Sequence, residues 1–293
     1  MNVYEETQLI LHKYKIQANK SLGQNFLVDD NVIDEIIRSS NIDKQDLIIE
    51  IGPGLGVLTN RLLQEANNVI AVELDKRMVN ILQDRFILNI NDQAESKLEI
   101  INGDILKINL NEIIAEKRKQ TEIKSVKIVA NLPYYISTPI IMKLLENRLD
   151  IDEIIVMVQK EVAERLTAKT GTRLAGAITY AVEYYSDPTS IIKVPKESFV
   201  PSPKVESEVI KLKVRKGKKI QVKDEKLLFN IISKSFMQRR KTLSNVLINN
   251  NIMHSKEDVK NMWKELEIDE NVRGESLTLE QFGEIADYIS EKK

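Results

Sequence analysis

Short apolar runs and longer helical segments alternate strictly between residues 46 and 158. The runs are rich in Ile, Val and Leu, and they cover residues 46–51, 69–74, 98–102, 127–130 and 153–158. The segments between them space apolar residues one helical turn apart, as in 57–66. Buried strands that alternate with helices form a parallel sheet with helices on both faces. We therefore predict an α/β fold for this part of the chain.

The pattern changes toward the end of the chain. Residues 207–214 alternate apolar and polar side chains and are predicted to form a late strand that closes the sheet. Residues 225–293 are predicted to be helical throughout. Within them, Thr278 and Gln281 have the spacing of a capping box, which marks the start of a helix.

This change of pattern predicts a domain boundary near 216–222. It separates a large domain of residues 1–216, with an N-terminal arm of residues 1–30, from a small helical domain of residues 217–293. The length of 293 residues is sufficient for two such domains. The contents of 42% hydrophobic and 30% charged residues are those of an ordinary globular protein.

The composition excludes several kinds of site. The chain has no cysteine, which excludes a disulfide framework, a thiolate zinc site and a cysteine nucleophile. His12 and His254 have no flanking ligand sets, so we expect no bound metal. No run approaches the roughly 18 apolar residues of a membrane helix, and the start lacks the apolar core of a signal peptide. We therefore expect a cytoplasmic protein that does not bind membranes.

Basic side chains concentrate between residues 204 and 241, although the formal net charge of the chain is only −1. This run includes Lys204 and the cluster Arg239, Arg240 and Lys241. For binding a polyanion, the local distribution of charge matters more than the net charge. A solvated linker and helix face is the more common explanation of such a run. The feature by itself therefore leaves both interpretations open.

A glycine-rich turn follows the first predicted strand, in "EIGPGLGVLT" at 50–59. Gly52, Gly54 and Gly56 alternate in it, and glycine lets a ligand approach the backbone closely. The third glycine comes one residue too early for the dinucleotide pattern G-x-G-x-x-G. The spacing E-x-G-x-G-x-G instead resembles the first motif of class I S-adenosylmethionine-dependent methyltransferases. A turn of this kind can also be purely structural.

Acidic residues also lie at the ends of the next two predicted strands. Glu73 lies 21 residues after Gly52, where an acid can accept hydrogen bonds from two ribose hydroxyls. Asp75 is an alternative, and the resemblance to methyltransferases selects Glu73. Asp104 follows the third strand, and there the resemblance implies a bond from an adenine amino group. Ligands bind at the carboxyl ends of strands in such sheets, so we expect these groups to line one site.

The fourth strand ends in "NLPYYIS", which starts at Asn131. Pro133 forces Leu132 into an extended conformation, which directs the Leu132 carbonyl, and Asn131 offers a side-chain carbonyl beside it. Two converging acceptors suit an amino group with two N–H donors, and they make its lone pair available for attack on an electrophilic methyl group. Tyr134 would supply a flat surface for a base withdrawn from its stack. Alternatively, Tyr134 and Tyr135 pack in the core behind a strand that ends at proline, and Tyr135 can be core even if Tyr134 contacts a base.

Several longer stretches extend the resemblance over nearly the whole chain. They are "NKSLGQNFLVD" (19–29), "NLPYYISTPI" (131–140), "VQKEVAERLTAKTGT" (158–172), "FVPSPKVESEVIKL" (199–212), "FMQRRKTLSNVL" (236–247) and "RGESLTLEQF" (273–282). Together they resemble the ribosomal RNA adenine dimethyltransferases, and most closely those of the bacterial small subunit. The resemblance implies a Rossmann-like class I methyltransferase sheet with a small C-terminal all-helical domain.

The same resemblance implies the reaction. S-adenosylmethionine would be the methyl donor, and N6 of two adjacent adenosines in a hairpin near the 3′ end of 16S rRNA would be dimethylated during assembly of the 30S subunit. The protein would act on 16S rRNA in the immature 30S subunit, and we expect it to be a monomer. After one transfer the nitrogen keeps only one N–H, so a second transfer requires room for the first methyl group.

The resemblance also assigns roles to residues of this chain. Those implied to bind the cofactor are Asn25, Leu27, Gly52, Gly54, Glu73, Asp104 and Asn131. Those implied to act on the target adenine are Asn131, Leu132, Tyr134 and Phe199, with Phe199 stacking on the face opposite Tyr134. Phe199 could instead be an apolar anchor for a proline-rich loop. Those implied to contact RNA phosphates are Lys204, Arg239, Arg240 and Lys241, and the last three are predicted to lie on a helix.

Two alternative functions share part of this pattern. Antibiotic-resistance enzymes that methylate one adenine of large-subunit rRNA also have the glycine turn and an "NLPY" type of motif, and the C-terminal stretches favour the small-subunit family over them. A non-catalytic ribosome assembly factor is the other alternative, and the intact Asn131, Pro133, Tyr134 and Glu73 argue against it. The tract "LAGAITYAVEYY" (174–185) departs from the tyrosine-glycine-x-leucine-serine tract that is usual in the family. RNA contacts there are expected to differ.

Overall fold

The computed structural model describes residues 1–87, 97–147 and 149–292 and divides into two compact units. The first unit comprises Met1–Ala163 and Thr189–Val214, and the second unit comprises Glu164–Pro188 and Arg215–Lys293. The second unit resumes close to the boundary that the sequence predicts at 216–222, and it also takes in a segment from the middle of the chain. The assignment of separate functions to 1–216 and 217–293 stays a prediction.

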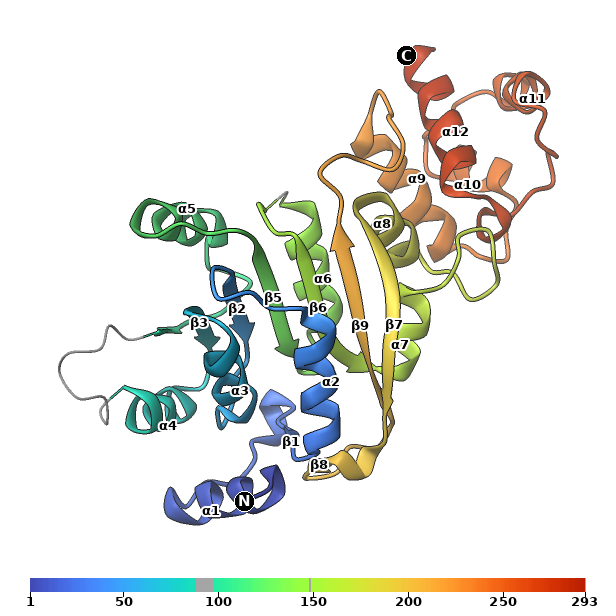
Figure 1. Ribbon diagram of the computed structural model, residues 1–293. Coiled ribbons are helices and arrows are strands. Elements are labelled where there is room, and N and C mark those ends of the chain that lie inside the picture. The colour runs from blue at the N-terminus through green and yellow to red at the C-terminus, as the bar shows by residue number, and fades with distance from the viewer. Residues whose placement is uncertain (88–96, 148, 293) are drawn as a thin grey trace. The chain divides into compact units, whose positions relative to one another are not determined.

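A seven-stranded sheet forms the centre of the first unit, with the strand order β4-β3-β2-β5-β6-β9-β7 (Figure 1). The strands are β2 (Leu47–Ile51), β3 (Asn68–Glu73), β4 (Leu98–Asn102), β5 (Val126–Asn131), β6 (Glu153–Gln159), β7 (Ser186–Val194) and β9 (Ser207–Val214). Strands β2 to β6 pair in parallel. All six strands that the sequence predicts are therefore confirmed. The parallel strands place all their carboxyl ends on one edge of the sheet.

The prediction that residues 207–214 close the sheet is wrong. Strand β9 lies inside the sheet, antiparallel to β6, and the edge is formed by β7. The sequence concealed β7 because it contains Pro188 and alternates poorly between buried and exposed side chains. Proline lacks an N–H for the strand ladder and is tolerated at the edge of a sheet, where one side of the strand needs no partner.

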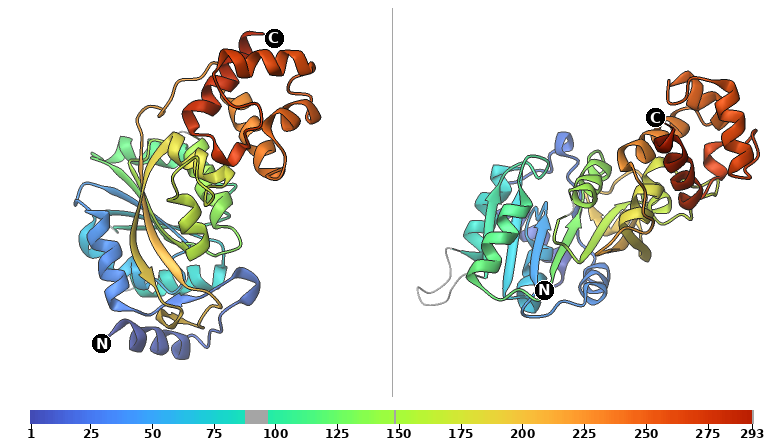
Figure 2. Two further views of the ribbon diagram at one scale, coloured as in Figure 1. Left: turned by 90° about the vertical axis from the view of Figure 1, so that its right-hand side faces the viewer. Right: turned by 90° about the horizontal axis from the view of Figure 1, so that it is seen from above.

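Helices flank the sheet on both faces (Figures 1 and 2). They are α2 (Asp30–Ser40), α3 (Val57–Glu65), α4 (Lys76–Phe86), α5 (Leu110–Gln120) and α6 (Ser137–Glu146), and α7 (Lys160–Leu166) follows β6. Asp29 and Asp75 cap the first turns of α2 and α4 with their carboxylates. The central strands are apolar on both faces, and Ile48, Ile49 and Ile128 have no exposed surface. Each such side chain contributes roughly 1.5–3 kcal/mol on burial.

The N-terminal arm contacts the rest of the first unit through its short strand and through its first helix. It consists of helix α1 (Val3–Lys13), the 3-10 helix η1 (Lys20–Leu22) and strand β1 (Phe26–Leu27), and β1 pairs with β8 (Phe199–Val200), which follows the 3-10 helix η2 (Lys196–Ser198). Arg85 of α4 donates to the Glu6 carboxylate of α1 and to the Leu55 carbonyl of the glycine turn. The arm is thus tied to the turn that the sequence singled out.

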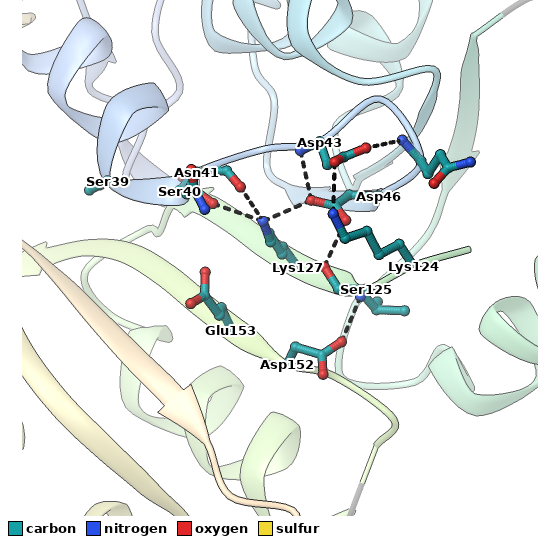
Figure 3. Close-up of polar contacts among 12 residues, drawn as sticks. Ser39, Ser40, Asn41, Asp43, Asp46, Lys124, Ser125, Lys127, Asp152 and Glu153 are labelled. Carbon is teal, nitrogen blue, oxygen red and sulfur yellow. Dashed lines mark hydrogen bonds and ion pairs between the residues drawn. The ribbon is translucent and has the colours of Figure 1, made fainter. Parts of the chain in front are cut away.

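A buried ionic network joins the amino-terminal edge of the sheet to the end of α2 (Figure 3). The Lys127 ammonium lies 2.7 Å from the Asp46 carboxylate and donates to the carbonyls of Ser40 and Asn41 at 3.0 and 2.6 Å. Asp46 also accepts from the Asp43 backbone N–H and from the Ser125 hydroxyl, each at 2.8 Å. Lys127 and Asp46 are 6% and 1% exposed. The charge pair therefore also satisfies the last carbonyls of a helix, which have no partner within the helix itself.

The second unit is helical. Its elements are α8 (Ala177–Tyr185), α9 (Glu225–Met237), α10 (Leu243–Asn249), α11 (Lys256–Glu265), the 3-10 helix η3 (Gly274–Ser276) and α12 (Leu279–Glu291). The capping box at Thr278 is confirmed as the start of α12. Tyr180 of α8 is fully buried, with its ring 5.3 Å from that of Phe236 and 5.2 Å from that of Phe282. Most of the tract 174–185, which departs from the usual pattern noted above, thus packs in the core of this unit. Leu174, at its start, is exposed.

The prediction of a helix through Arg239, Arg240 and Lys241 is wrong. Helix α9 ends at Met237, and these three residues lie in the turn before α10. The backbone N–H of Lys241 donates to the carbonyl of Gln238 at 2.8 Å, which closes the turn. Thr242 then caps α10 through its hydroxyl. Over the residues that the structure describes, no helix combines the length and the apolar character needed to cross a membrane.

Candidate active site

A cavity opens at the carboxyl edge of the sheet in the first unit. Its walls come from the turns after β2, β4 and β5, from the end of β3 and from the arm segment between Leu22 and Leu27. All the residues predicted to bind a cofactor line it, namely Asn25, Leu27, Gly52, Gly54, Glu73, Asp104 and Asn131. Leu132 and Tyr134 line it as well. The structure therefore brings together residues that are up to 109 positions apart in the chain.

The glycine turn forms one wall and places backbone where a side chain would intrude. Gly52 and Gly54 have φ angles of +69° and +57°, a backbone region that residues other than glycine rarely adopt. The Gly54 N–H donates to the Glu73 carboxylate at 3.1 Å. A Cβ atom at Gly54 would lie 3.5 Å from the Phe26 ring of the arm. The turn is therefore held between the end of β3 and the arm.

Glu73 is the acid that faces the cavity. It is 7% exposed, and its carboxylate accepts from the backbone N–H groups of Gly54 and Asp75. Burial raises the pKa of Glu73, and these N–H groups partly offset the rise. Asp75 does not line the cavity. It caps α4 and binds Arg77, and the hydrogen bond from the Arg77 guanidinium lowers its pKa. The position of the two carboxylates thus agrees with the choice of Glu73 over Asp75.

A second buried carboxyl group, Glu50, lies at the base of the cavity. It is 2% exposed and accepts a hydrogen bond of 2.6 Å from the Thr59 hydroxyl. Burial raises the pKa of Glu50 to about 8, against the lowering effect of that hydrogen bond, and the nearby Glu73 adds to the rise. Sequence reasoning did not assign Glu50 a role. Its position two residues before Gly52 was the available signal, because β2 delivers it to the same edge.

Asn131 and Leu132 present two hydrogen-bond acceptors on the cavity wall. The Asn131 side-chain amide donates to the Asn25 backbone carbonyl of the arm at 3.3 Å, which leaves the side-chain oxygen as the acceptor. The Leu132 N–H donates to the Met157 carbonyl at 3.2 Å, and the residue is 1% exposed. Among the residues that the structure describes, no donor bonds to the Asn131 side-chain oxygen or to the Leu132 carbonyl. Both acceptors remain available to a ligand.

The two tyrosines after Pro133 differ in their surroundings. Tyr134 is half-buried, and its hydroxyl lies 2.6 Å from the Ser207 hydroxyl at the start of β9. Burial raises the pKa of Tyr134, partly offset by this hydrogen bond. The interpretation of Tyr135 as a core residue is wrong, because it is 58% exposed. Residues directly after the strand no longer follow its alternation, so the sequence pattern could not place Tyr135.

Phe199 lies away from the cavity lining. It is 2% exposed, pairs with Leu27 through β8 and β1, and belongs to the main apolar core. A role for Phe199 in stacking on an adenine would require its ring to leave this packing. The arrangement favours the alternative of an apolar anchor for the loop that follows.

The arm is fastened beside the cavity by a residue that sequence reasoning did not single out. Gln24 donates from its side-chain amide to the Asp75 carboxylate at 3.0 Å, and its side-chain oxygen accepts from the Asn19 backbone N–H at 2.8 Å. Gln24 thus joins the arm to the capping residue of α4. Its position inside "GQNFL" was the only signal in the sequence, and nothing in the local pattern indicated its partner.

The predicted RNA-binding residues lie in two places. Lys204 is exposed in the loop between β8 and β9 of the first unit. Arg240 and Lys241 are exposed in the turn after α9 of the second unit. Arg239, in the same turn, donates to the Ala175 carbonyl at 2.9 Å and places its guanidinium 5.0 Å from the centre of the Phe236 ring. Arg239 therefore has a packing role within the second unit.

Comparison with known proteins gives consistent results. The family described as "Ribosomal RNA adenine dimethylase" matches residues 15–291. Proteins named "Ribosomal RNA small subunit methyltransferase A" from Lachnoclostridium phytofermentans and Clostridioides difficile are 46% and 41% identical over 289 and 292 residues. These alignments cover 98% and 100% of this chain and 97% and 98% of the relatives.

Solved structures show the same fold. A dimethyladenosine transferase from Plasmodium falciparum superposes with a TM-score of 0.73 at 26% identity, covering 89% of this chain and 95% of that one. The 23S rRNA methyltransferase ErmE superposes with a TM-score of 0.66 at 20% identity, covering 91% of this chain and all of its own. The predicted class I methyltransferase sheet with a C-terminal helical region is therefore confirmed.

Proposed function

Because this chain belongs to the ribosomal RNA adenine dimethylase family, we propose that it dimethylates N6 of two adjacent adenosines of 16S rRNA, in a hairpin near the 3′ end. Family membership makes the protein an S-adenosylmethionine-dependent rRNA adenine dimethyltransferase. More specifically, the substrate is the 16S rRNA of an immature 30S subunit, and the enzyme acts as a monomer in the cytoplasm. The names of the relatives support the small subunit as the target.

The chemistry of the cavity lining fits the cofactor. The Glu73 carboxylate can accept from vicinal ribose hydroxyls, and the Asp104 carboxylate can accept from an adenine amino group. Gly52 and Gly54 leave their backbone open to the cavity, and Asn25 and Leu27 cover it from the arm. When bound, S-adenosylmethionine supplies a methyl group attached to a cationic sulfur, which is the electrophile. The remaining chemistry belongs to the side chains and backbone of this protein.

The two free acceptors of Asn131 and Leu132 carry the proposed mechanism. An adenine amino group has two N–H donors, and each acceptor takes one of them. These bonds hold the nitrogen in place and reduce delocalisation of its lone pair into the ring. The Asn25 carbonyl holds the Asn131 amide so that its oxygen is the end presented to the base. Tyr134, steadied by Ser207, offers its ring to the base, and stacking of this kind stabilises a flipped nucleotide.

Methyl transfer to isolated ribosomal subunits tests this proposal. Labelled S-adenosylmethionine is incubated with immature small subunits and separately with large subunits, and the modified nucleoside is identified by its mass. Dimethyladenosine in the small subunit is the expected result. Label only in the large subunit would assign the protein to the resistance type. Tight binding to the small subunit without label in either would favour an assembly factor.

We assign phosphate contacts to Lys204, Arg239, Arg240 and Lys241, because all four are exposed and basic. Each phosphate that a protein neutralises steepens the dependence of affinity on salt by about 0.7–0.9 in the logarithmic slope. Replacing both Arg240 and Lys241 with alanine should therefore flatten that slope by about 1.5. The measurement is the affinity for small-subunit rRNA at several salt concentrations. Lys264→Ala on α11, an exposed lysine outside the basic run, is the control, and an equal slope in both proteins would place the RNA elsewhere.

A further inference from the structure

Tyr135 is a large aromatic side chain at the mouth of the cavity. It is 58% exposed, yet it is among the residues that line the cavity. It follows Tyr134 directly, on the side of the cavity that carries Asn131 and Leu132. In the part of the chain that the structure describes, no hydrogen bond to its hydroxyl and no aromatic ring packed against it is found. Such a ring contributes little to the stability of the first unit.

The structure nevertheless keeps this ring in a defined place. A Cβ atom at Gly23 would lie 3.3 Å from Cδ1 of Tyr135 and 3.8 Å from Cβ of Pro133. Gly23 has a φ angle of +61°, so glycine serves both the turn of the arm and the close approach of the ring. The ring thus lies close to the arm at Gly23, and Tyr135 is still 58% exposed. A supported, uncovered aromatic surface beside a cavity is suited to stacking.

We propose that Tyr135 stacks on the base next to the target adenosine. The inference rests on the proposed function. When one base is withdrawn into the cavity, its neighbour in the strand loses a stacking partner. The Tyr135 ring, adjacent to Tyr134, can replace that partner for the nucleotide left at the mouth. In an RNA with two adjacent adenosines, the neighbour is itself a target, so Tyr135 would hold one adenosine while Asn131 and Leu132 engage the other.

An RNA base fits this surface better than a protein side chain does. Recognition of single-stranded RNA relies on unstacked bases that lie on exposed aromatic rings. The hydroxyl of Ser207 forms a hydrogen bond with the Tyr134 hydroxyl. The exposed, basic Lys204 lies three residues before Ser207 in the chain. The ring is also continuous with the lining of the cavity that takes the target base. Both observations favour a nucleotide as the occupant.

Binding of a synthetic RNA hairpin tests the inference. The loop contains two adjacent adenosines, and a second hairpin has an abasic nucleotide in place of one of them. Stacking on an aromatic side chain changes the affinity of single-stranded nucleic acid by about 5- to 100-fold per base. Tyr135→Leu should therefore weaken binding of the normal hairpin about 10-fold, whereas Tyr135→Phe should stay within about 2-fold. The abasic hairpin should bind wild type and Tyr135→Leu equally.

Controls separate stacking from other effects. Tyr4→Leu removes a tyrosine that is 51% exposed on α1 and does not line the cavity, and it should leave hairpin affinity unchanged. Affinity for S-adenosylmethionine should be the same in wild type and Tyr135→Leu. Equal affinity of wild type and Tyr135→Leu for the normal hairpin, or an abasic penalty of the same size in both proteins, would overturn the inference. Normal dimethylation of small subunits in that case would show that only the role of Tyr135 fails.

Discussion

The two edges of the central sheet both bury ionisable side chains, but these side chains have different partners at the two edges. At the amino-terminal edge, the Lys127 ammonium meets a carboxylate and two carbonyls, and Asp46 receives two further hydrogen bonds (Figure 3). At the carboxyl edge, Glu50 has one hydroxyl partner, and two acceptors at Asn131 and Leu132 face the cavity. The first edge is organised for stability and the second for binding.

This difference has a physical cause. A buried charge or polar group without a partner costs several kcal/mol, so folding tolerates it only where something else is gained. Under the proposed function, the missing partners at the carboxyl edge are atoms of a ligand. The positive φ angles of the glycine turn belong to the same region. Left-handed backbone and acceptors on a cavity wall therefore indicate function at this edge more directly than burial alone does.

The largest effect is expected from Asn131→Ala, which removes one of the two acceptors. Methyl transfer should fall by about 100- to 1000-fold, in line with the loss of a single preorganised hydrogen bond to a reacting group. Affinity for rRNA and the thermal unfolding temperature should change little, because the side chain makes a single 3.3 Å hydrogen bond within the protein. Single-turnover methylation of small subunits is the measurement. Normal turnover by this variant would contradict the mechanism.

The opposite behaviour is expected from Lys127→Ala at the other edge. This change leaves the Asp46 carboxylate buried without its cation, and it also removes a partner from the carbonyls of Ser40 and Asn41. The free energy of unfolding should fall by about 3–5 kcal/mol. The rate of methyl transfer, measured at a temperature where the variant is still folded, should stay close to that of wild type. Denaturant unfolding of the variant and of wild type measures the free energy of unfolding.

Lys124→Ala is the matched control for Lys127→Ala. Lys124 pairs with Asp43 in the same network, but its side chain is 61% exposed. Exposed pairs contribute about 0–1 kcal/mol, so this variant should be nearly as stable as wild type. Equal destabilisation by the two lysine variants would show that burial does not distinguish these pairs. The contrast between the two edges would then lose its basis.

A pH-dependent effect on stability is expected from Glu50→Gln. The pKa of Glu50 in the folded protein is raised from 4.5 to about 8, so the folded state holds a proton that the unfolded state releases. The stabilisation from this proton is complete below pH 4.5 and is lost as the pH rises to about 8. Glutamine keeps an acceptor for Thr59 and cannot ionise.

Thermal unfolding of both proteins at pH 5, 7 and 9 measures this effect. The stability of Glu50→Gln relative to wild type should increase steadily from pH 5 to pH 9. A difference between the two proteins that does not change with pH would mean that Glu50 stays ionised in the folded state. The buried carboxyl groups of the two edges would then not differ in charge.

Much of the site was predictable because local rules decide it. Strand ends in a parallel sheet share one edge, so Gly52, Glu73, Asp104 and Asn131 could be grouped there from the order of the predicted strands. The choice of Glu73 over Asp75 and the role of Asp104 came from the resemblance to methyltransferases. Residues whose role depends on distant partners could not be placed. Gln24 depends on Asp75, and Arg239 depends on the Ala175 carbonyl, 64 positions away in the chain. The turn at Arg239 was mistaken for helix because apolar spacing continues from α9 into α10.

The sequence by itself determined the order of the six predicted strands and of the helical segments between them, the family and the residue types at the carboxyl edge. Periodicity and motif spacing are local properties of the chain, so they could be read without the structure. Only the tertiary structure decided that β7 forms the edge, that Phe199 is buried and that Tyr135 is exposed. It also decided that the arm carbonyl of Asn25 orients Asn131. These outcomes depend on which surfaces are covered by segments far away in the sequence, and burial and hydrogen-bond partners are set by that packing.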